Sequence, residues 1–233
     1  MRLDAPADAR ELHGDARAFR VAPIRLATIA LLLFVALAVW MMFAPTAGVA
    51  ERWIDRSLSA SPGSVAFEVA RGVSFVGSSS VVIAISLLLA VVAWRSSHRL
   101  RLVLLCLVAP ALAGAGELVM KQFVGRSRPA TSTLTGASGF GFPSGHTAGA
   151  TALAVVVASL ASILIVAGRR RGYVVRLAVL YAFAVGVSRV VVGAHQALDV
   201  VGGWLFGVAA ALIAFSALVP RPSEGPVERM STE

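Results

Sequence analysis

The sequence predicts an all-α membrane protein in which six transmembrane helices form one bundle. Hydrophobic residues make up 58% of the 233 residues, and the mean hydropathy is +0.82. Charged residues make up only 14%, whereas a water-soluble domain carries about 25%. The apolar residues also occur in unbroken runs of roughly 18–22 residues, the length of helix that crosses a hydrocarbon core of about 30 Å.

Six such runs follow one another along the chain, and we expect each to be one span: 26–44, 75–94, 102–120, 147–167, 177–192 and 200–219. The third run contains the small residues 113–116, and the sixth contains Gly203 and Gly207. Small residues at this spacing predict close approach between helices. Cys106 lies inside the third run, where we expect it to pack without reacting.

The two ends of the chain differ from the spans in composition. Residues 1–25 mix arginines with acidic residues and lack a clear cleavage site, so we expect a cytoplasmic tail rather than a cleaved signal. Residues 220–233 are rich in proline and polar residues, which predicts a disordered cytoplasmic tail. The membrane domain is therefore expected to cover 26–219.

Arginines predict how the bundle is oriented. The second and fourth connections between spans are short and basic, which is typical of the cytoplasmic side. They contain Arg95, Arg99 and Arg101, and Arg169, Arg170, Arg171 and Arg176. Both termini would then be cytoplasmic, and the first, third and fifth connections would lie outside.

The first connection, 45–74, has a mixed pattern. It combines Glu51, Arg52 and Asp55 with Trp53 and Leu58. This pattern fits a short helix lying in the membrane interface, and it fits a solvated loop equally well.

The net charge of +9 says less about binding partners here than it would in a soluble protein. A strongly basic soluble chain would suggest nucleic acid as a partner. Here many cations lie at the ends of apolar runs, and no basic patch with interleaved aromatic residues is present. We therefore expect the membrane, and no nucleic acid, as the partner; the sequence does not indicate an oligomeric state.

The third and fifth connections carry chemically active residues, and the predicted topology places them on one membrane face. Lys121, Arg128 and Arg189 offer cations suited to phosphate oxygens. Ser144 adds a hydroxyl, and Gly145 lets backbone N–H groups approach an anion at a helix start.

Two histidines complete this set. His195 and Asp199 are four residues apart, so a helix beginning near His195 would place them on one face. The carboxylate would keep one imidazole nitrogen protonated and leave the other free to attack phosphorus. His146, from the other connection, could protonate the leaving group.

Each of these residues also has a structural interpretation. Lys121 could pair with Glu117 one turn earlier. For Glu117 we favour this structural pair over a catalytic role. Asp199 could simply be a favourable charge at a helix N-terminus. Arg126 and Arg128, however, lie on the face that the positive-inside rule disfavours, and an anionic substrate would explain their presence.

The pattern of these residues resembles the type 2 phosphatidic acid phosphatase family, which shares its site with vanadium haloperoxidases. The family motifs K-x6-R-P, P-S-G-H and S-R-x5-H-x3-D match in order and without departure. They occupy Lys121 to Pro129, Pro143 to His146, and Ser188 to Asp199.

The resemblance implies a six-helix membrane bundle that hydrolyses lipid phosphates or diphosphates without a metal or other cofactor. It implies His195 as the nucleophile through a phosphohistidine, Asp199 as its partner and His146 as the acid. It places Lys121, Arg128, Ser144, Gly145 and Arg189 around the phosphate, with Arg126 only as a possible contact.

The predicted position of the site favours one class of substrate and disfavours two other classes of protein. An outward-facing site suits a polyprenyl diphosphate carrier, with phosphatidic acid or phosphatidylglycerol phosphate as the alternative. A haloperoxidase is disfavoured because members of that kind are soluble. A non-enzymatic transporter is disfavoured because the ionisable residues gather at one face and not at the middle of the spans.

Overall fold

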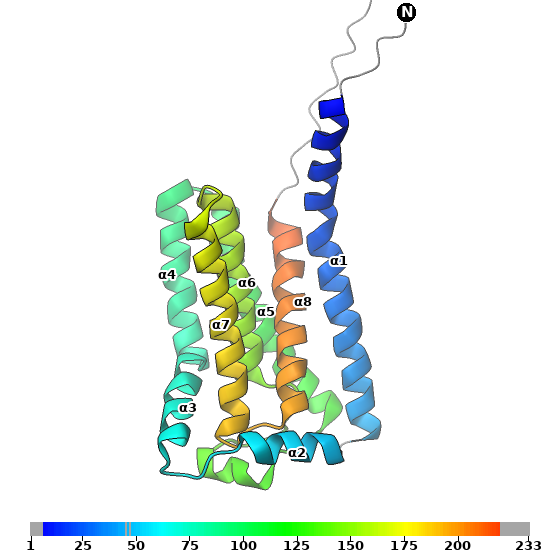
Figure 1. Cartoon of the computed structure of the whole chain (residues 1–233), viewed down its shortest axis with the longest axis vertical. Helices are drawn as coiled ribbons and strands as arrows, with labels where there is room; N and C mark the ends of the chain where they lie inside the picture. The colour runs from blue at the N-terminus through cyan, green and yellow to red at the C-terminus, as the bar shows by residue number, and fades with distance from the viewer. Residues whose placement is uncertain (1–6, 45, 47, 220–233) are drawn as a thin grey trace, which may run out of the picture.

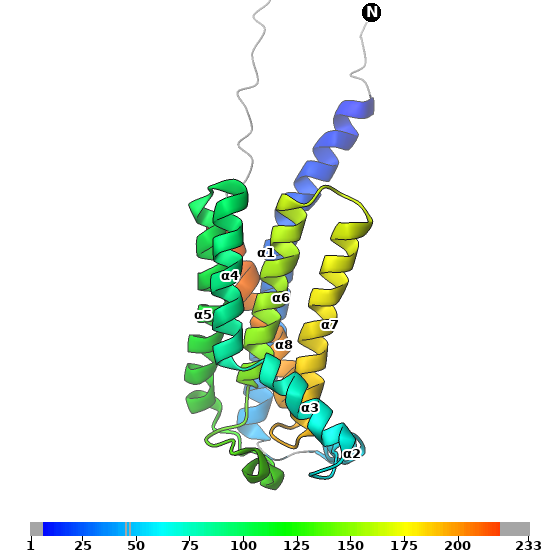
Figure 2. The ribbon, with the colours of Figure 1, turned by 90° about the vertical axis from the view of Figure 1, so that its left-hand side faces the viewer.

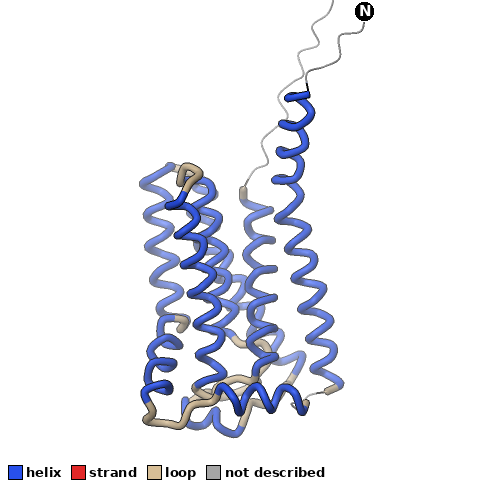
Figure 3. The backbone as a smooth tube through the Cα atoms, viewed as in Figure 1, coloured by secondary structure: helices blue, strands red, loops and turns tan. Residues whose placement is uncertain are grey.

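The computed structural model describes residues 7–44, 46 and 48–219. Within these residues the chain is helical and contains no strand (Figure 3). The elements are α1 (Ala7–Phe43), α2 (Val49–Leu58), α3 (Val65–Val76), α4 (Ser79–Ser97), α5 (Leu100–Val124), the 3-10 helix η1 (Ala130–Thr135), α6 (Gly145–Leu164), α7 (Arg169–Val191) and α8 (Ala197–Leu218).

The prediction of six membrane-spanning helices is confirmed. Six described helices are long and apolar enough to cross a membrane: Ala22–Phe43 within α1, and all of α4, α5, α6, α7 and α8. Most predicted boundaries differ from these by a few residues. The largest difference is in α7, which begins at Arg169 where the prediction began at 177, because helical backbone continues through the arginine-rich turns that a hydropathy pattern excludes.

The described part of the N-terminal segment is helical. Residues 7–21, expected to belong to a polar cytoplasmic tail, continue into the first span, so α1 is one helix of 37 residues. That these residues form a cytoplasmic tail stays a prediction. Charged residues form helices as readily as apolar ones when their propensity allows, so polarity does not mark where a helix begins. The predicted disordered tail, 220–233, lies outside the described residues.

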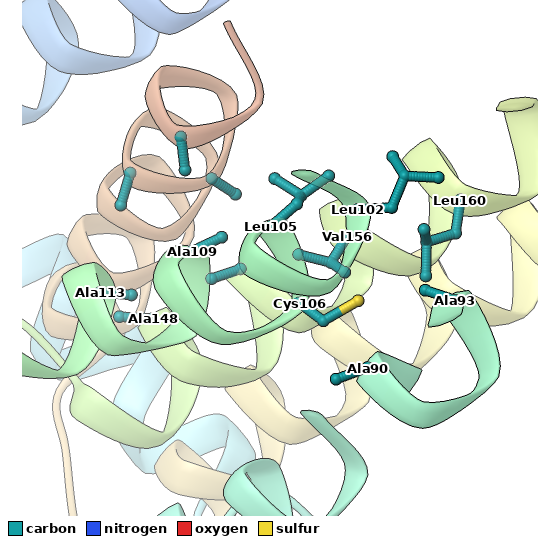
Figure 4. Packing of buried hydrophobic residues seen from close by; sticks show 14 residues of the cluster. Ala90, Ala93, Leu102, Leu105, Cys106, Ala109, Ala113, Ala148, Val156 and Leu160 are labelled. Atoms are coloured by element: carbon teal, nitrogen blue, oxygen red, sulfur yellow. The ribbon is translucent and has the colours of Figure 1, made fainter. Parts of the chain in front are cut away.

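Figures 1 and 2 show the long helices running up and down as one bundle. α6 packs against α4, α5, α7 and α8, and α1 packs against α8. Figure 4 shows the largest buried cluster, in which Cys106 of α5 lies among small and branched side chains such as Ala90 and Val156, as expected for an inert packing residue. Large apolar side chains such as Leu32, Leu88 and Leu180 are exposed on the outer surface, as lipid contact requires.

Gly203 and Gly207, predicted to allow close packing, do so, whereas a Cβ added at Gly114 of the third span would have no atom within 4 Å. A Cβ added at Gly203 would lie 2.7 Å from the side chain of Thr147. A Cβ added at Gly207 would lie 2.5 Å from the carbonyl oxygen of Ala148. Only glycine lets α8 approach α6 so closely, and this contact brings the first turn of α8 beside the first turn of α6.

The connection over 45–74 is helical rather than a loop. It forms α2, which crosses one end of the bundle, and α3, which leads into α4 (Figure 1). The second span was predicted to begin at Phe75, but this residue belongs to α3 and the span begins at Ser79. That α2 lies in a membrane interface stays a prediction.

Candidate active site

Three connections meet at one end of the bundle. The connection containing α2, the connection 125–144 and the turn 192–196 lie together at the end away from the α4–α5 and α6–α7 turns (Figures 1 and 2). This arrangement confirms the prediction that the residues of the third and fifth connections share one face. Which side of the membrane this face occupies stays a prediction.

Asp199 organises the start of α8. The helix begins at Ala197, two residues later than His195, and Gln196 is its N-cap. Asp199 Oδ2 accepts the backbone N–H of Gln196 at 3.0 Å and lies 3.4 Å from His195 Nδ1. The spacing alone predicted that the two side chains would share one face of a helix. They meet instead through a capping arrangement, because His195 precedes the helix and Asp199 lies in its first turn.

Arg128 fixes the tautomer of His195. Its Nη1 donates to the carbonyl oxygen of Ala194 at 2.9 Å and lies 3.0 Å from His195 Nε2. Because a guanidinium has no acceptor, Nε2 must be the unprotonated nitrogen, and the ring proton must lie on Nδ1 facing Asp199. Burial lowers the pKa of His195 to about 4, although Asp199 acts in the opposite direction. The ring is therefore neutral at physiological pH.

Arg189 anchors the turn that carries His195. Its carbonyl oxygen accepts the N–H groups of Ala194 and His195 at 3.0 and 3.1 Å. Its buried guanidinium donates from Nη1 to Ser74 Oγ of α3. Ser74 is a partner that the sequence alone did not indicate, because nothing in its neighbourhood distinguishes it from the serines at the start of α4.

Ser144 and Gly145 begin α6 directly beside this turn. The backbone N–H of Ser144 donates to the carbonyl oxygen of Asp199 at 2.9 Å, and its buried hydroxyl accepts the hydroxyl of Thr147 at 2.9 Å. A Cβ added at Gly145 would lie 2.5 Å from Glu117 Oε1. This position therefore has room only for glycine while the Glu117 carboxylate occupies its place.

Lys121 and His146 lie at the same site. Lys121 Nζ pairs with Glu117 Oε2 at 2.7 Å, as predicted for this pair. His146, the second residue of α6, is half-buried. The charged groups that act on its ring come from α5, from the 125–144 connection and from the end of α7: Lys121, Arg128, Arg189 and His195. The predicted acid, nucleophile and phosphate-binding cations are thus gathered within one cluster.

Arg126 does not belong to this cluster as a phosphate contact. Its side chain has no exposed surface, and its two terminal nitrogens donate to carboxylates. Nη1 reaches Asp199 Oδ1 at 2.7 Å, and Nη2 reaches Glu51 Oε2 at 2.6 Å. Burial lowers the pKa of Arg126, but the two carboxylates outweigh it, so the net direction is upward. The structure therefore corrects the suggested role: Arg126 lies behind Asp199 and holds it.

Sequence reasoning missed two acidic residues of α2. Glu51 Oε1 accepts the N–H of Leu198 at 3.0 Å, and Asp55 Oδ1 accepts the N–H of Ala197 at 2.9 Å. These are N–H groups of the first turn of α8, which have no partner within the helix itself. The available signal was the spacing of Glu51 and Asp55, four residues apart and so on one face of α2. Burial, together with the nearby carboxylates, raises the pKa of Asp55 to about 6.

Two cavities adjoin the cluster. One, of about 440 Å³, lies between α2 and residues 127–129. The other, of about 250 Å³, lies between α4, α5 and α6 and has mostly apolar and small walls, with Glu117 and Gly145 at its site end. Among the described residues, no group of three or more His, Cys, Asp or Glu side chains is placed to hold a metal ion. Independence from metal stays a prediction.

Comparisons with known proteins agree with this arrangement. Residues 101–222 match the model of the PAP2 superfamily. A phosphatidylglycerophosphatase B of Bacillus subtilis (strain 168) is 36% identical over 91 residues, which cover 39% of this chain and 45% of that relative. The aligned region therefore spans less than half of the relative's length.

A solved structure resembles the whole bundle. It is the crystal structure of a transmembrane PAP2 type phosphatidylglycerolphosphate phosphatase from Bacillus subtilis. The two chains superpose with a TM-score of 0.70 at 25% sequence identity, over 87% of this chain and 100% of that one. The likeness therefore extends beyond the motif region to the helices that surround it.

Proposed function

Because this chain belongs to the PAP2 superfamily, we propose that it is a multi-pass membrane phosphatase that removes a phosphate group from a lipid. The observation that carries the proposal is the geometry around His195. A neutral imidazole with its proton on Nδ1 presents Nε2 to a group of cations, beside a second histidine at the start of a helix. Such a group supplies a nucleophile, an acid and a phosphate site together.

In the proposed first step, His195 Nε2 attacks phosphorus and forms a phosphohistidine while the bond to the lipid oxygen breaks. His146 donates a proton to that oxygen. Positive charge develops on the His195 ring as the new bond forms, and the Asp199 carboxylate stabilises it. In the second step water attacks phosphorus, His146 takes a proton from it, and the bond to Nε2 breaks to release inorganic phosphate.

The phosphate oxygens would be held by Lys121, Arg128 and Arg189, with Ser144 and the backbone at Gly145. Arg128 has a further task, because its Nη1 now faces the lone pair that must attack. A phosphate oxygen that accepts this N–H frees the lone pair of Nε2, so substrate binding itself would activate the nucleophile. Among the described residues, Nη2 of Arg128 has no partner and could make the second bond of a bidentate contact.

The surroundings of the cluster favour a lipid. The cavity of about 250 Å³ runs from Glu117 and Gly145 along apolar walls between three membrane-spanning helices. An alkyl chain attached to a phosphate in the cluster would find an apolar path there. A small soluble phosphate ester would gain nothing from it.

Among lipids, we propose phosphatidylglycerol phosphate as the first candidate. Both named relatives are phosphatases of that lipid by their descriptions. They favour it over the polyprenyl diphosphate that the outward-facing site suggested from sequence, which becomes the second candidate. Phosphatidic acid is a further candidate, as a lipid with one phosphate.

The proposed orientation follows from the arginines. The α4–α5 and α6–α7 turns are basic and lie at the opposite end from the cluster (Figure 1). The positive-inside rule makes that end cytoplasmic and places the cluster, with α2, on the extracytoplasmic face of the plasma membrane. Both termini would then be cytoplasmic.

Release of inorganic phosphate by the purified protein in detergent tests the function. We expect release from phosphatidylglycerol phosphate, and more slowly from phosphatidic acid and a polyprenyl diphosphate, with equal rates in EDTA and with inhibition by vanadate. His195→Ala is the control for a contaminating phosphatase. Absence of release from all three lipids would contradict the function. Loss in EDTA that Mg²⁺ or Zn²⁺ restores would contradict the metal-independent mechanism alone.

A further inference from the structure

The Glu117 carboxylate lies beside two of the groups that are proposed to hold the phosphate. Its Oε2 pairs with Lys121 Nζ at 2.7 Å. Its Oε1 would lie 2.5 Å from a Cβ added at Gly145, the first residue of α6. A lysine and a helix N-terminus favour any anion, so this carboxylate and a phosphate group compete for the same surroundings.

The same carboxylate acts on a second cation of the cluster. Burial lowers the pKa of Arg128, and the negative charges of Asp199 and Glu117 act in the opposite direction. Glu117 is thus part of the electrostatic surroundings of the phosphate site, although it belongs to the membrane-spanning helix α5. An ionisable side chain in such a helix is costly, and it marks a functional role more often than a structural one.

Little besides Lys121 holds Glu117 in place. In the part of the chain that the structure describes, Lys121 is the one ion-pair or hydrogen-bond partner of this carboxylate. Glu117 also lies at the site end of the cavity of about 250 Å³. A side chain that has a single ion pair and adjoins a cavity can turn away when an anion of higher charge takes Lys121.

A site that offered only cations would retain inorganic phosphate. This phosphate is the last product of the proposed mechanism, and its release can limit the rate of turnover. Tight binding of product and substrate alike lowers KM but does not raise kcat. Competition from Glu117 weakens the binding of every phosphate group by the free energy of its own pair with Lys121.

We propose that Glu117 is a positioning residue that competes with phosphate for Lys121, binds the lysine when the site is empty and so promotes the release of inorganic phosphate. The inference rests on the proposed function and deepens it, because it assigns the control of product release to one side chain. A purely structural pair would have the opposite effect, since Glu117 would then hold Lys121 in position for the phosphate. The two roles therefore differ in the sign of their effect on phosphate affinity.

Inhibition of lipid hydrolysis by inorganic phosphate, measured in detergent, tests this sign. Glu117→Gln keeps the shape of the side chain and removes its charge. It should lower the inhibition constant of inorganic phosphate about tenfold, the effect of one charge-assisted contact. KM for phosphatidylglycerol phosphate should fall as well, while kcat should not rise. Glu117→Asp, which keeps the charge on a shorter side chain, should lie between the two proteins. An inhibition constant that is unchanged or higher in Glu117→Gln would overturn the proposal.

The matched control is Glu68→Gln, which removes the same charge from an exposed residue of α3 that pairs with Arg71. Its inhibition constant for inorganic phosphate should equal that of the unsubstituted protein. A fall as large as that in Glu117→Gln would mean that the net charge of the protein is responsible, which would overturn competition for Lys121.

A second measurement does not need turnover. Inorganic phosphate should raise the unfolding temperature of Glu117→Gln more than that of the unsubstituted protein, because a ligand stabilises the folded state according to its affinity. An equal or smaller rise in Glu117→Gln would contradict the competition. If the unsubstituted protein hydrolyses no lipid but the larger rise in Glu117→Gln is present, the proposed function is refuted and the effect of Glu117 on phosphate binding stands.

Discussion

His195 lies between a guanidinium and a carboxylate, and this position determines its ionisation. The ring is buried, which lowers its pKa from about 6.5 to about 4. We expect ¹⁵N NMR of the histidine rings in detergent to show His195 neutral, with its proton on Nδ1, from about pH 7.5 down to about pH 5. His195→Ala assigns the signal.

The sign of the pH effect on stability follows from the same shift. Between the unfolded and the folded pKa, the unfolded chain binds a proton at His195 that the folded chain does not. The contribution of this residue to stability is therefore lost as the pH falls from about 6.5 to about 4. Protonation of His195 with a midpoint near 6.5 in the folded protein would contradict this description of the site.

The two histidines should respond differently to the leaving group. We expect His195→Ala to abolish turnover of every substrate, because the proposed mechanism has no other nucleophile. General acid catalysis contributes about 10²–10⁴-fold, mostly for basic leaving groups. His146→Ala should therefore be severely slow on a lipid monophosphate and much less impaired on p-nitrophenyl phosphate, with a lipid diphosphate between them.

Rapid-mixing measurements keep the two steps of this prediction apart. If His146 also activates water, slow hydrolysis of the phosphoenzyme would reduce the contrast at steady state. The first burst of leaving-group release reports phosphoenzyme formation alone. Equal loss on all substrates in that burst would mean that His146 binds phosphate and does not donate a proton.

The sequence motifs predicted which residues gather at the site, but they did not predict which side chains contact each other there. Lys121, Arg128, Arg189 and His146 could be placed near each other because topology and spacing brought their connections to one face. The role of Arg126 could not be predicted, because Arg126 and Arg128 lie in one short loop and the sequence does not show which of them faces the phosphate. Only the fold shows that Arg126 turns inward to Glu51 and Asp199.

At the level of elements, α2 acts as a cap for α8. Its Glu51 and Asp55 accept N–H groups of the first turn of α8, and Arg126 joins Glu51 to Asp199. Apart from the spacing of Glu51 and Asp55, nothing in residues 49–58 distinguishes this helix from one that lies on a membrane surface, since both need an apolar and a charged face. The spans themselves were predictable because their long apolar runs reflect a requirement of the bilayer and not of a particular partner.

Removal of Arg126 tests this assembly. Arg126→Met would leave Glu51 and Asp199 as buried carboxylates without their shared cation, and we expect a loss of about 3–5 kcal/mol. Glu51→Gln keeps an oxygen for the N–H of Leu198 and should cost less. Thermal unfolding in detergent measures both.

An exposed ion pair gives the matched control for that comparison. Glu68→Gln removes the surface pair with Arg71 on α3, and such pairs contribute about 0–1 kcal/mol. The expected order of unfolding temperature is unsubstituted protein and Glu68→Gln highest, then Glu51→Gln, then Arg126→Met. An Arg126→Met protein as stable as Glu68→Gln would show that the buried network does not hold the site together.

At the level of the whole molecule, orientation in the membrane is the main prediction to test. In a Cys106→Ala background, a cysteine at Thr133 of η1, whose side chain is exposed, should react with an impermeant reagent added to intact cells. A cysteine at Arg170, at the other end of the bundle, should react only after the cells are opened. Labelling in the reverse order would place the cluster in the cytoplasm and remove the argument for a substrate presented outside.

The contacts between α2 and α8 also bear on how the protein is made. They join residues 142 and 147 positions apart in the chain. A ribosome adds about 5–20 residues per second, so α2 waits on the order of ten seconds for its partner. A nascent chain inserted as far as α7 already holds His146 and Arg189 but lacks the histidine that would attack. Under the proposed mechanism, the partly synthesised protein cannot hydrolyse the lipids around it, and hydrolysis would begin only after the last span has entered the membrane.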